Sequence, residues 1–274
     1  MLSIVFSVKD PVGVNASKIL VKNLDAKPSS CPISVLCYRS DEVVIAGFEP
    51  DQTLFEFLDV TPEPRADAVI VLSRHESQRG VRSLTVHFTG NPTSEAPFGG
   101  RPGELAFAPA PLAKALLQSY RRRAAELGLL ERYSISLEAT HHGPTGNMKP
   151  LVFIEIGSTE NEWGDREALE AMAGAVLDVL TSGAVPRCSP TIGLGSTHYP
   201  EKFTELELGE GCMGHMFSKH VLGKLAPGAL RQAVEKSLPN GASEALIEKK
   251  GASSSLRHAL IDELARMGVD VRPV

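Results

Sequence analysis

Apolar runs that stop at polar loops are the main pattern along this chain. The run Ala68–Leu72 is continuous, which is typical of a strand buried on both faces of a sheet. Residues 84–88 alternate, so Leu84 and Val86 share one face while His87 lies on the other. Similar patterns predict strands at residues 4–8, 33–38, 43–46, 134–140, 151–156, 191–194, 245–248 and 269–271. Helical spacing predicts helices at residues 12–24, 111–127, 166–180, 227–238 and 255–267.

The alternation of strands and helices over the last two thirds of the chain predicts an α/β fold. We expect a mixed, mostly parallel sheet with helices on both faces, and ligands beyond the carboxyl ends of the strands. Residues 89–110 are rich in Gly and Pro and predict a long, functional or mobile loop. One domain over residues 1–274 is expected, with a smaller N-terminal lobe within residues 1–60 as the alternative.

Composition places the chain among ordinary globular proteins. Its 274 residues, with 42% hydrophobic and 22% charged positions, are enough to bury a full core. A net charge of −5 argues against indiscriminate nucleic-acid binding but leaves room for a local basic face. No apolar run is long enough to span a bilayer, and residues 1–10 lack the basic start of a signal peptide. We therefore expect a cytoplasmic monomer without membrane contact.

The four cysteines form no C-x-x-C pair and are too few for a disulfide scaffold in a chain of this length. We expect them to be reduced and mostly buried, as in cytosolic proteins. A soft metal site near His198 and His215 is the less favoured alternative for Cys188 and Cys212.

Four histidines follow the ends of apolar runs, where packing does not require an imidazole: His75, His141, His142 and His198. Imidazole titrates near neutral pH and binds metals as the neutral base, so this placement indicates chemistry. Side chains alternate in an extended segment, so the adjacent pair faces one site only if the backbone twists at Gly143-Pro144. His220 and His258 are assigned to the surface.

Three roles are open for these imidazoles. One can act as a general base, with Glu138 or Glu76 fixing its tautomer. Two or three can hold zinc beside an Asp or Glu and an open water position. They can also polarise a carbonyl group. The sequence contains no H-E-x-x-H, no G-x-S-x-G and no P-loop, so each role depends on the fold bringing scattered residues together.

Four segments, together and in this order, resemble the archaeal and plant type of D-aminoacyl-tRNA deacylase. They are Ser73-Arg74-His75-Glu76-Ser77, Ser83–His87 with Gly90-Asn91, Glu138-Ala139-Thr140-His141-His142-Gly143-Pro144, and Gly195-Ser196-Thr197-His198-Tyr199-Pro200. Gly214-His215 is a fifth, shorter match, and the resemblance extends from Ser7 to the last predicted helix. Ser196 stands where a glycine is expected, which puts in doubt any role that needs a bare backbone there.

The resemblance implies hydrolysis of the ester between a D-amino acid and the 3′ end of tRNA, with zinc as cofactor. It also implies a three-layer α/β/α fold similar to peptidyl-tRNA hydrolases and phosphorylase-like hydrolases. The expected catalytic residues are Glu138, His141 and His142. The expected zinc ligands are His75, His141 and His198. The expected orienting residues are Glu76, His87 and His215. The expected tRNA contacts are Arg74, Arg79, Arg82, Arg121, Arg122, Arg123 and Lys202.

Two other functions fit the same residues. A metal-dependent amidase or peptidase acting on a small substrate would use the same histidines in an enclosed, acidic pocket. A tRNA-binding protein without catalysis would need only a basic surface.

Overall fold

An eight-stranded sheet forms the centre of the computed structural model, which describes residues 1–77, 80–183 and 185–274. In spatial order its strands are β2 (Lys27–Pro28), β3 (Leu36–Arg39), β4 (Val43–Phe48), β1 (Leu2–Ser7), β5 (Ala68–Glu76), β9 (Leu151–Ser158), β6 (Ser83–His87) and β8 (Ser134–Leu137). Only the β2–β3, β3–β4 and β6–β9 pairs of this described sheet are antiparallel. The expected α/β class with a mixed, mostly parallel sheet is confirmed.

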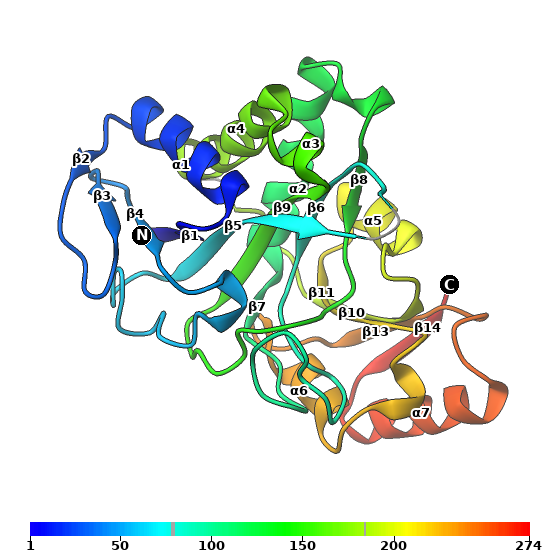
Figure 1. The fold of residues 1–274 in the computed structure, drawn as a ribbon. Helices are drawn as coiled ribbons and strands as arrows, with labels where there is room; N and C mark the ends of the chain where they lie inside the picture. The colour runs from blue at the N-terminus through cyan, green and yellow to red at the C-terminus, as the bar shows by residue number, and fades with distance from the viewer. Residues whose placement is uncertain (78–79, 184) are drawn as a thin grey trace.

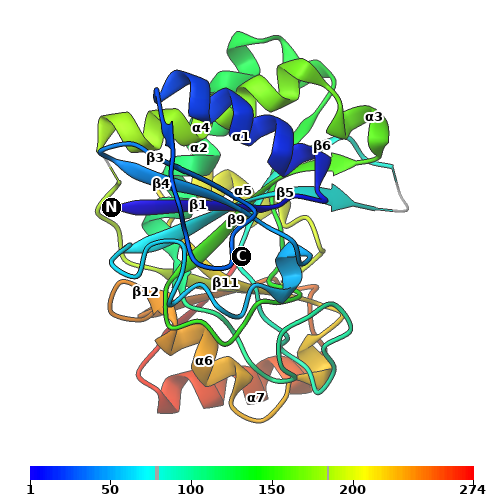
Figure 2. The same cartoon turned by 60° about the vertical axis from the view of Figure 1, so that its left-hand side comes forward.

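Three helices cover one face of this sheet (Figures 1 and 2). They are α1 (Pro11–Asn23), α2 (Ala110–Glu126) and α4 (Arg166–Ser182). Alternate strand residues such as Ile70 and Ile154 pack against them in the largest apolar core. Their strand neighbours Val71 and Phe153 point to the opposite face and build a smaller core. That opposite face carries the polar side chains at the ends of the strands.

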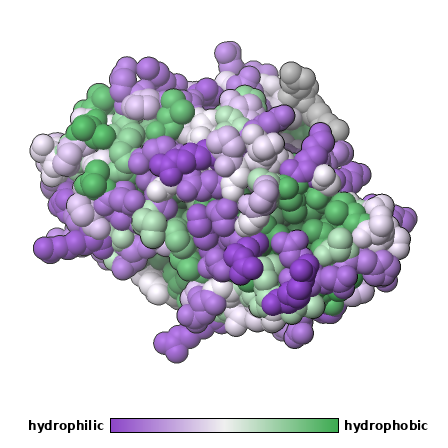
Figure 3. All heavy atoms as spheres, turned by 90° about the horizontal axis from the view of Figure 1, so that it is seen from below, coloured by the Kyte–Doolittle hydropathy of each residue, from purple (hydrophilic) through white to green (hydrophobic). Residues whose placement is uncertain are grey.

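A second, four-stranded sheet lies on the other side of the molecule (Figure 1). Its strands are β11 (Met213–Ser218), β10 (Thr191–Ser196), β13 (Glu244–Ile247) and β14 (Asp270–Pro273), all parallel. It packs with α6 (Ala229–Glu235) and α7 (Ser254–Arg266) around its own core. The face on which these helices lie is mostly hydrophilic, with smaller hydrophobic areas between (Figure 3).

Further short elements are α3 (Glu160–Trp163), α5 (Glu201–Leu208), the paired β7 (Ala108–Pro109) and β12 (Ser237–Leu238), and three 3-10 turns at residues 52–54, 129–131 and 222–224. The sequence pattern missed β11, because a glycine and a histidine interrupt its apolar residues, and it missed the short α5. The helix predicted at 227–238 is only seven residues long. Gly228 precedes it with a φ of 81°, and Ser237–Leu238 pair with β7 instead of continuing the helix.

The prediction of reduced cysteines is wrong in this structure. Cys31 is bonded to Cys37, and Cys188 is bonded to Cys212. The Cα atoms of the two pairs lie 5.8 and 6.0 Å apart, a separation that a disulfide spans. The second pair joins residues 24 positions apart, and only the fold makes them neighbours. Within the described ranges, no helix combines the length and hydropathy needed to cross a membrane.

Candidate active site

Two neighbouring strands place His75 and Glu155 on the same face of the large sheet. His75 lies near the end of β5, opposite Gly157 of the parallel strand β9. Glu155 lies two residues earlier on β9, and its Oε2 is 3.2 Å from Nδ1 of His75. Both side chains are buried, at 7% and 2% exposure. A buried carboxylate in an otherwise apolar strand requires a charged or hydrogen-bonding partner, which His75 provides.

His87 reaches the same carboxylate from the other side. It ends β6, which runs antiparallel to β9 and pairs His87 with Phe153. Its Nε2 lies 3.4 Å from Oε1 of Glu155, and its side chain is fully buried. The strand alternation correctly places His87 on the face opposite Leu84, and this face is the one that carries the site.

The segment after β8 brings three more groups. Glu138 is fully buried, and its Oε1 is 3.2 Å from Nδ1 of His75. The rings of His141 and His142 lie 4.4 Å apart, so they share one site. The twist that this requires occurs at His142 itself, whose φ is 43°, one residue before the expected Gly143-Pro144.

A loop from the second sheet completes the cluster. The N–H of Ala139 donates to the carbonyl of His198 at 2.8 Å, which holds the loop after β10 against the Glu138 segment. Nε2 of His198 is 2.8 Å from Oε2 of Glu138. The hydroxyl of Tyr199 is 2.8 Å from Nε2 of His75. The site therefore lies where the two sheets meet.

His215 is a fully buried residue that hydrogen-bonds to the segment carrying His141. Its Nε2 donates to the carbonyl of Ala106 at 2.9 Å, so its Nδ1 accepts from the hydroxyl of Thr140 at 3.0 Å. The same hydroxyl accepts from the N–H of Met216 at 3.1 Å. Burial lowers the pKa of His215 to about 4, in keeping with this neutral tautomer. These bonds tie the residue before His141 to strand β11.

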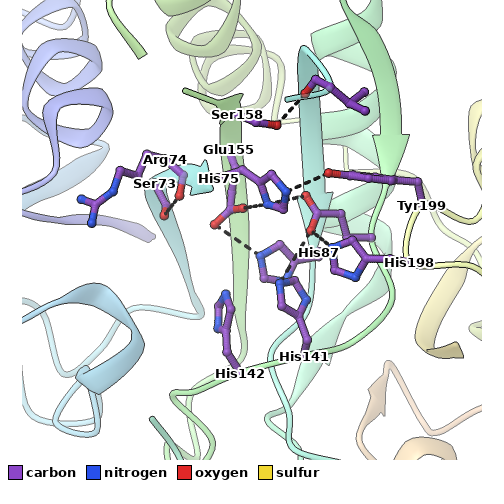
Figure 4. A network of polar contacts seen from close by, with 12 residues as sticks. Ser73, Arg74, His75, His87, His141, His142, Glu155, Ser158, His198 and Tyr199 are labelled. Carbon is purple, nitrogen blue, oxygen red and sulfur yellow. Dashed lines mark hydrogen bonds and ion pairs between the residues drawn. The ribbon is translucent and has the colours of Figure 1, made fainter. Parts of the chain in front are cut away.

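Figure 4 shows the imidazoles converging on the carboxylates. Ring centroids are 4.4 Å apart for His87 and His141, 4.8 Å for His141 and His198, and 5.9 Å for His75 and His198. A cleft of about 640 Å³ opens over His75, His141, His142 and Glu155. Pro97–Gly99 of the predicted long loop line this cleft, and Phe98 is 68% exposed there. The four histidines at the ends of apolar runs thus meet in one place.

Backbone carbonyls fix the tautomers of three imidazoles. Nδ1 of His87 lies 3.2 Å from the carbonyl of Phe88, Nδ1 of His141 2.9 Å from that of Ala139, and Nδ1 of His142 2.6 Å from that of Gly143. A carbonyl only accepts, so each Nδ1 carries a proton, and each ring in its neutral form keeps a lone pair on Nε2. This arrangement is the one in which histidine binds a metal through Nε2. Burial opposes protonation of His87, but the charge of Glu155 raises the pKa of this ring.

Burial and charge separate the ionisation of these groups. Burial lowers the pKa of His142 to about 4, and burial also lowers the pKa of His141. Burial opposes protonation of His75 as well, but the hydrogen bond to Glu155 and the charge of Glu138 raise its pKa to about 9. Burial opposes ionisation of Glu138, yet His198 and His75 lower its pKa to about 2. At neutral pH the site therefore holds an ionised Glu138, a cationic His75, and neutral His141 and His142.

Two groups of three side chains in the described chain can bind a cation. One consists of His87, His141 and His142, and the other of His75, Glu138 and His198. In each group the potential ligand atoms lie within 4.8 Å of one another. Nε2 of His87 and both oxygens of Glu138 are buried without an aligned hydrogen bond inside the described ranges. The structure therefore divides the predicted ligands His75, His141 and His198 between the two groups.

The predicted basic contacts are dispersed. Arg74 lines the cleft. Arg82 pairs with Glu162 at 3.1 Å, and Arg122 and Arg123 pair with Asp178 across the helix layer. Arg121, on α2, and Lys202, on α5, are exposed. Arg79 lies outside the described residues. Of this set, the structure brings Arg74 to the cleft, where Glu76 also lies.

The sequence interpretation missed Glu155 and Tyr199 as site residues. Glu155 gave a signal, since it is the only charged residue in the apolar run Leu151–Ile156 and a charge is rarely buried without function. Tyr199 stands beside His198 in a quoted motif, but nothing in the sequence indicates that its hydroxyl faces His75. His220 and His258 are exposed, as expected.

Comparisons with known proteins identify relatives that match most of the chain. A family model described as D-aminoacyl-tRNA deacylase matches residues 62–272. A D-aminoacyl-tRNA deacylase from Aeropyrum pernix is 43% identical over 274 residues and is covered to 98%, as is this chain. One from Hyperthermus butylicus is 44% identical over 241 residues, which cover 86% of this chain and 88% of the relative.

A crystal structure described as a conserved protein of unknown function superposes with a TM-score of 0.91 at 31% identity. The superposition covers 100% of this chain and 95% of that one, so the second sheet belongs to the shared fold. Sequence matches of this identity and coverage confirm the resemblance inferred from the histidine motifs. The chain belongs to the D-aminoacyl-tRNA deacylase family.

Proposed function

We propose that this protein hydrolyses the ester between a D-amino acid and the 3′ end of tRNA, releasing both. The observation that supports this most strongly is that His75, His87, His141 and His198 lie against two buried carboxylates at an open cleft. The ring of His142 packs beside those of His87 and His141 (Figure 4). Ester hydrolysis needs an activated water and stabilisation of the oxyanion, and such a cluster can supply both.

We further propose that His87, His141 and His142 hold a zinc ion. Each of these rings has its Nδ1 bonded to a backbone carbonyl, and the buried Nε2 of His87 has no aligned partner in the described chain. Three imidazoles are a known ligand set for catalytic zinc. Both ring nitrogens of His75 are already engaged, by Glu155 and Tyr199, so the second group is less suited to a metal.

A zinc ion bound there would lower the pKa of a bound water and polarise the ester carbonyl. In this proposal the protons are handled by the other group of residues. The carboxylate of Glu138 favours the proton on Nε2 of His198, which leaves Nδ1 of His198 to accept a proton from water. The charge of Glu138 then stabilises the imidazolium. His198 is suited to exchange with solvent because 41% of its side chain is exposed.

The test is a deacylation assay with D-Tyr-tRNA and L-Tyr-tRNA as separate substrates. The intact protein is expected to hydrolyse the D-ester and to leave the L-ester intact. His141→Ala and His142→Ala are each expected to lower kcat by at least about a hundredfold, the range for loss of a central catalytic group. His258→Ala, an exposed imidazole on α7, is the matched control. Unchanged turnover in both cleft variants would exclude these residues from the reaction.

A further inference from the structure

A second groove of about 650 Å³ adjoins the cleft and is not used by the reaction proposed above. It shares Arg74 and Glu76 with the cleft, so the two hollows meet at the end of β5. Its other walls come from the start of α1 and from α3, and they include Asn15 and Trp163. The side chain of Arg74 points away from the imidazoles (Figure 4).

The groove contains two flat groups and an amide. The guanidinium carbon of Arg74 lies 5.4 Å from the ring centroid of Trp163. The indole is held in place, since its Nε1 donates to the carbonyl of His75 at 3.0 Å. Asn15 is half-buried on α1 and can donate as well as accept. Aromatic and guanidinium planes of this kind stack on nucleobases, and an amide can hydrogen-bond to a base edge.

The charges of the groove do not suit a phosphate. Lys9 and Arg74 are balanced by the carboxylates of Glu76 and Glu160, which line the same groove. Lys9 also lies 3.4 Å from Glu49, and Arg74 lies 3.9 Å from the buried carboxylate of Asp10. The carboxylates of the groove would therefore repel an anion about as strongly as its cations attract it. A neutral, planar ring carries no charge and is not repelled in this way.

We propose that this groove binds a nucleobase of the single-stranded 3′ end of tRNA, stacked on the Trp163–Arg74 pair. The inference rests on the proposed deacylase function, because that function brings the acceptor end to the adjoining cleft. The direct bond between Trp163 and the His75 carbonyl sets the groove beside the imidazole cluster. A base held here positions the terminal ester over the cluster without contacting the reacting atoms.

Trp163 is the only tryptophan of the chain, so its fluorescence reports on this groove alone. The trinucleotide CCA is expected to quench it saturably, and inorganic phosphate at equal concentration is not. Asn15→Ala is expected to weaken the quenching severalfold. Asn23→Ala, an exposed position on the same helix, is the matched control and is expected to leave it unchanged.

Kinetics separate stacking from a merely structural role of Trp163. Trp163→Ala is expected to raise KM for D-Tyr-tRNA by roughly five- to a hundredfold, the range for one lost base stack, with little change in kcat. Trp163→Phe keeps a ring but loses the bond to His75, so it is expected to retain a KM near that of the parent. Gly164→Leu adds a side chain to the groove lining at a site where the nearest atom is 3.5 Å from a new Cβ, and it is expected to raise KM.

Equal losses in Trp163→Phe and Trp163→Ala would overturn the proposal in favour of a structural role. So would the absence of CCA quenching in protein that hydrolyses D-Tyr-tRNA. If D-Tyr-tRNA is not hydrolysed at all, the proposed function fails, and the fluorescence titration still decides whether the groove binds a nucleobase.

Discussion

Glu207 provides a prediction whose magnitude follows from its surroundings. The side chain lies on α5 and is fully buried. Its Oε2 accepts from the N–H of Met213 at 2.6 Å, while Oε1 has no partner among the described residues. Lys114 lies close by, but its Nζ donates to main-chain carbonyls, including those of Glu207 at 3.2 Å and Gly209 at 2.7 Å. Burial therefore dominates and raises the pKa of Glu207 from 4.5 to about 8.

The raised pKa makes the stability of the fold depend on pH. Below pH 4.5 the carboxyl group is neutral in both the folded and unfolded chain, and it has no effect. As pH rises from 4.5 to about 8, the unfolded chain releases its proton first, so the free energy of unfolding falls. At about 1.4 kcal/mol per pH unit, the full loss is roughly 5 kcal/mol, an upper estimate for a group in this position.

Glu207→Gln keeps the shape and the acceptor for Met213 but removes the ionisation. We expect little change in the free energy of unfolding at pH 4.5 and a gain at pH 9 of up to roughly 5 kcal/mol. Urea unfolding of both proteins at the two pH values measures this. Glu205→Gln, an exposed residue on the same helix, is the control. A gain of equal size at both pH values would refute the reasoning, since it would not come from the titration of Glu207.

Three further predictions concern the site. Dialysis against a strong chelator should abolish deacylation, and about one equivalent of zinc per chain should restore it; full activity in metal-free protein would exclude the zinc proposal. Thr140→Val should lower the free energy of unfolding by about 2–4 kcal/mol, because His215 and Met216 each lose a buried partner, while Thr140→Ser should not; equal losses would contradict this. The affinity for tRNA should fall as salt rises, because contacts of exposed basic residues such as Arg121 and Lys202 with phosphates release counterions, and a flat titration would remove these residues from the interface.

The sequence by itself determined the class of fold and showed which histidines follow the ends of apolar runs. The periodicity of apolar residues identified buried strands of the large sheet, such as β5 and β9. A strand that is buried on both faces needs apolar side chains at successive positions, so its signal is local in the sequence. The same periodicity also placed His75, His141 and His198 at the ends of apolar runs. These are local features, and the residues that carry them are adjacent in the chain.

Only the tertiary structure decided which residues meet. Glu155 lies 80 positions from His75, and the pairing of β5 with β9 alone makes them partners. His87 was expected to orient other groups, and the antiparallel pairing of β6 with β9 brings its ring to 4.4 Å from that of His141. The left-handed backbone at His142, the two disulfides and the second sheet are likewise products of packing. Strand order and long-range contacts depend on the free energy of the whole fold, which no window of local sequence contains.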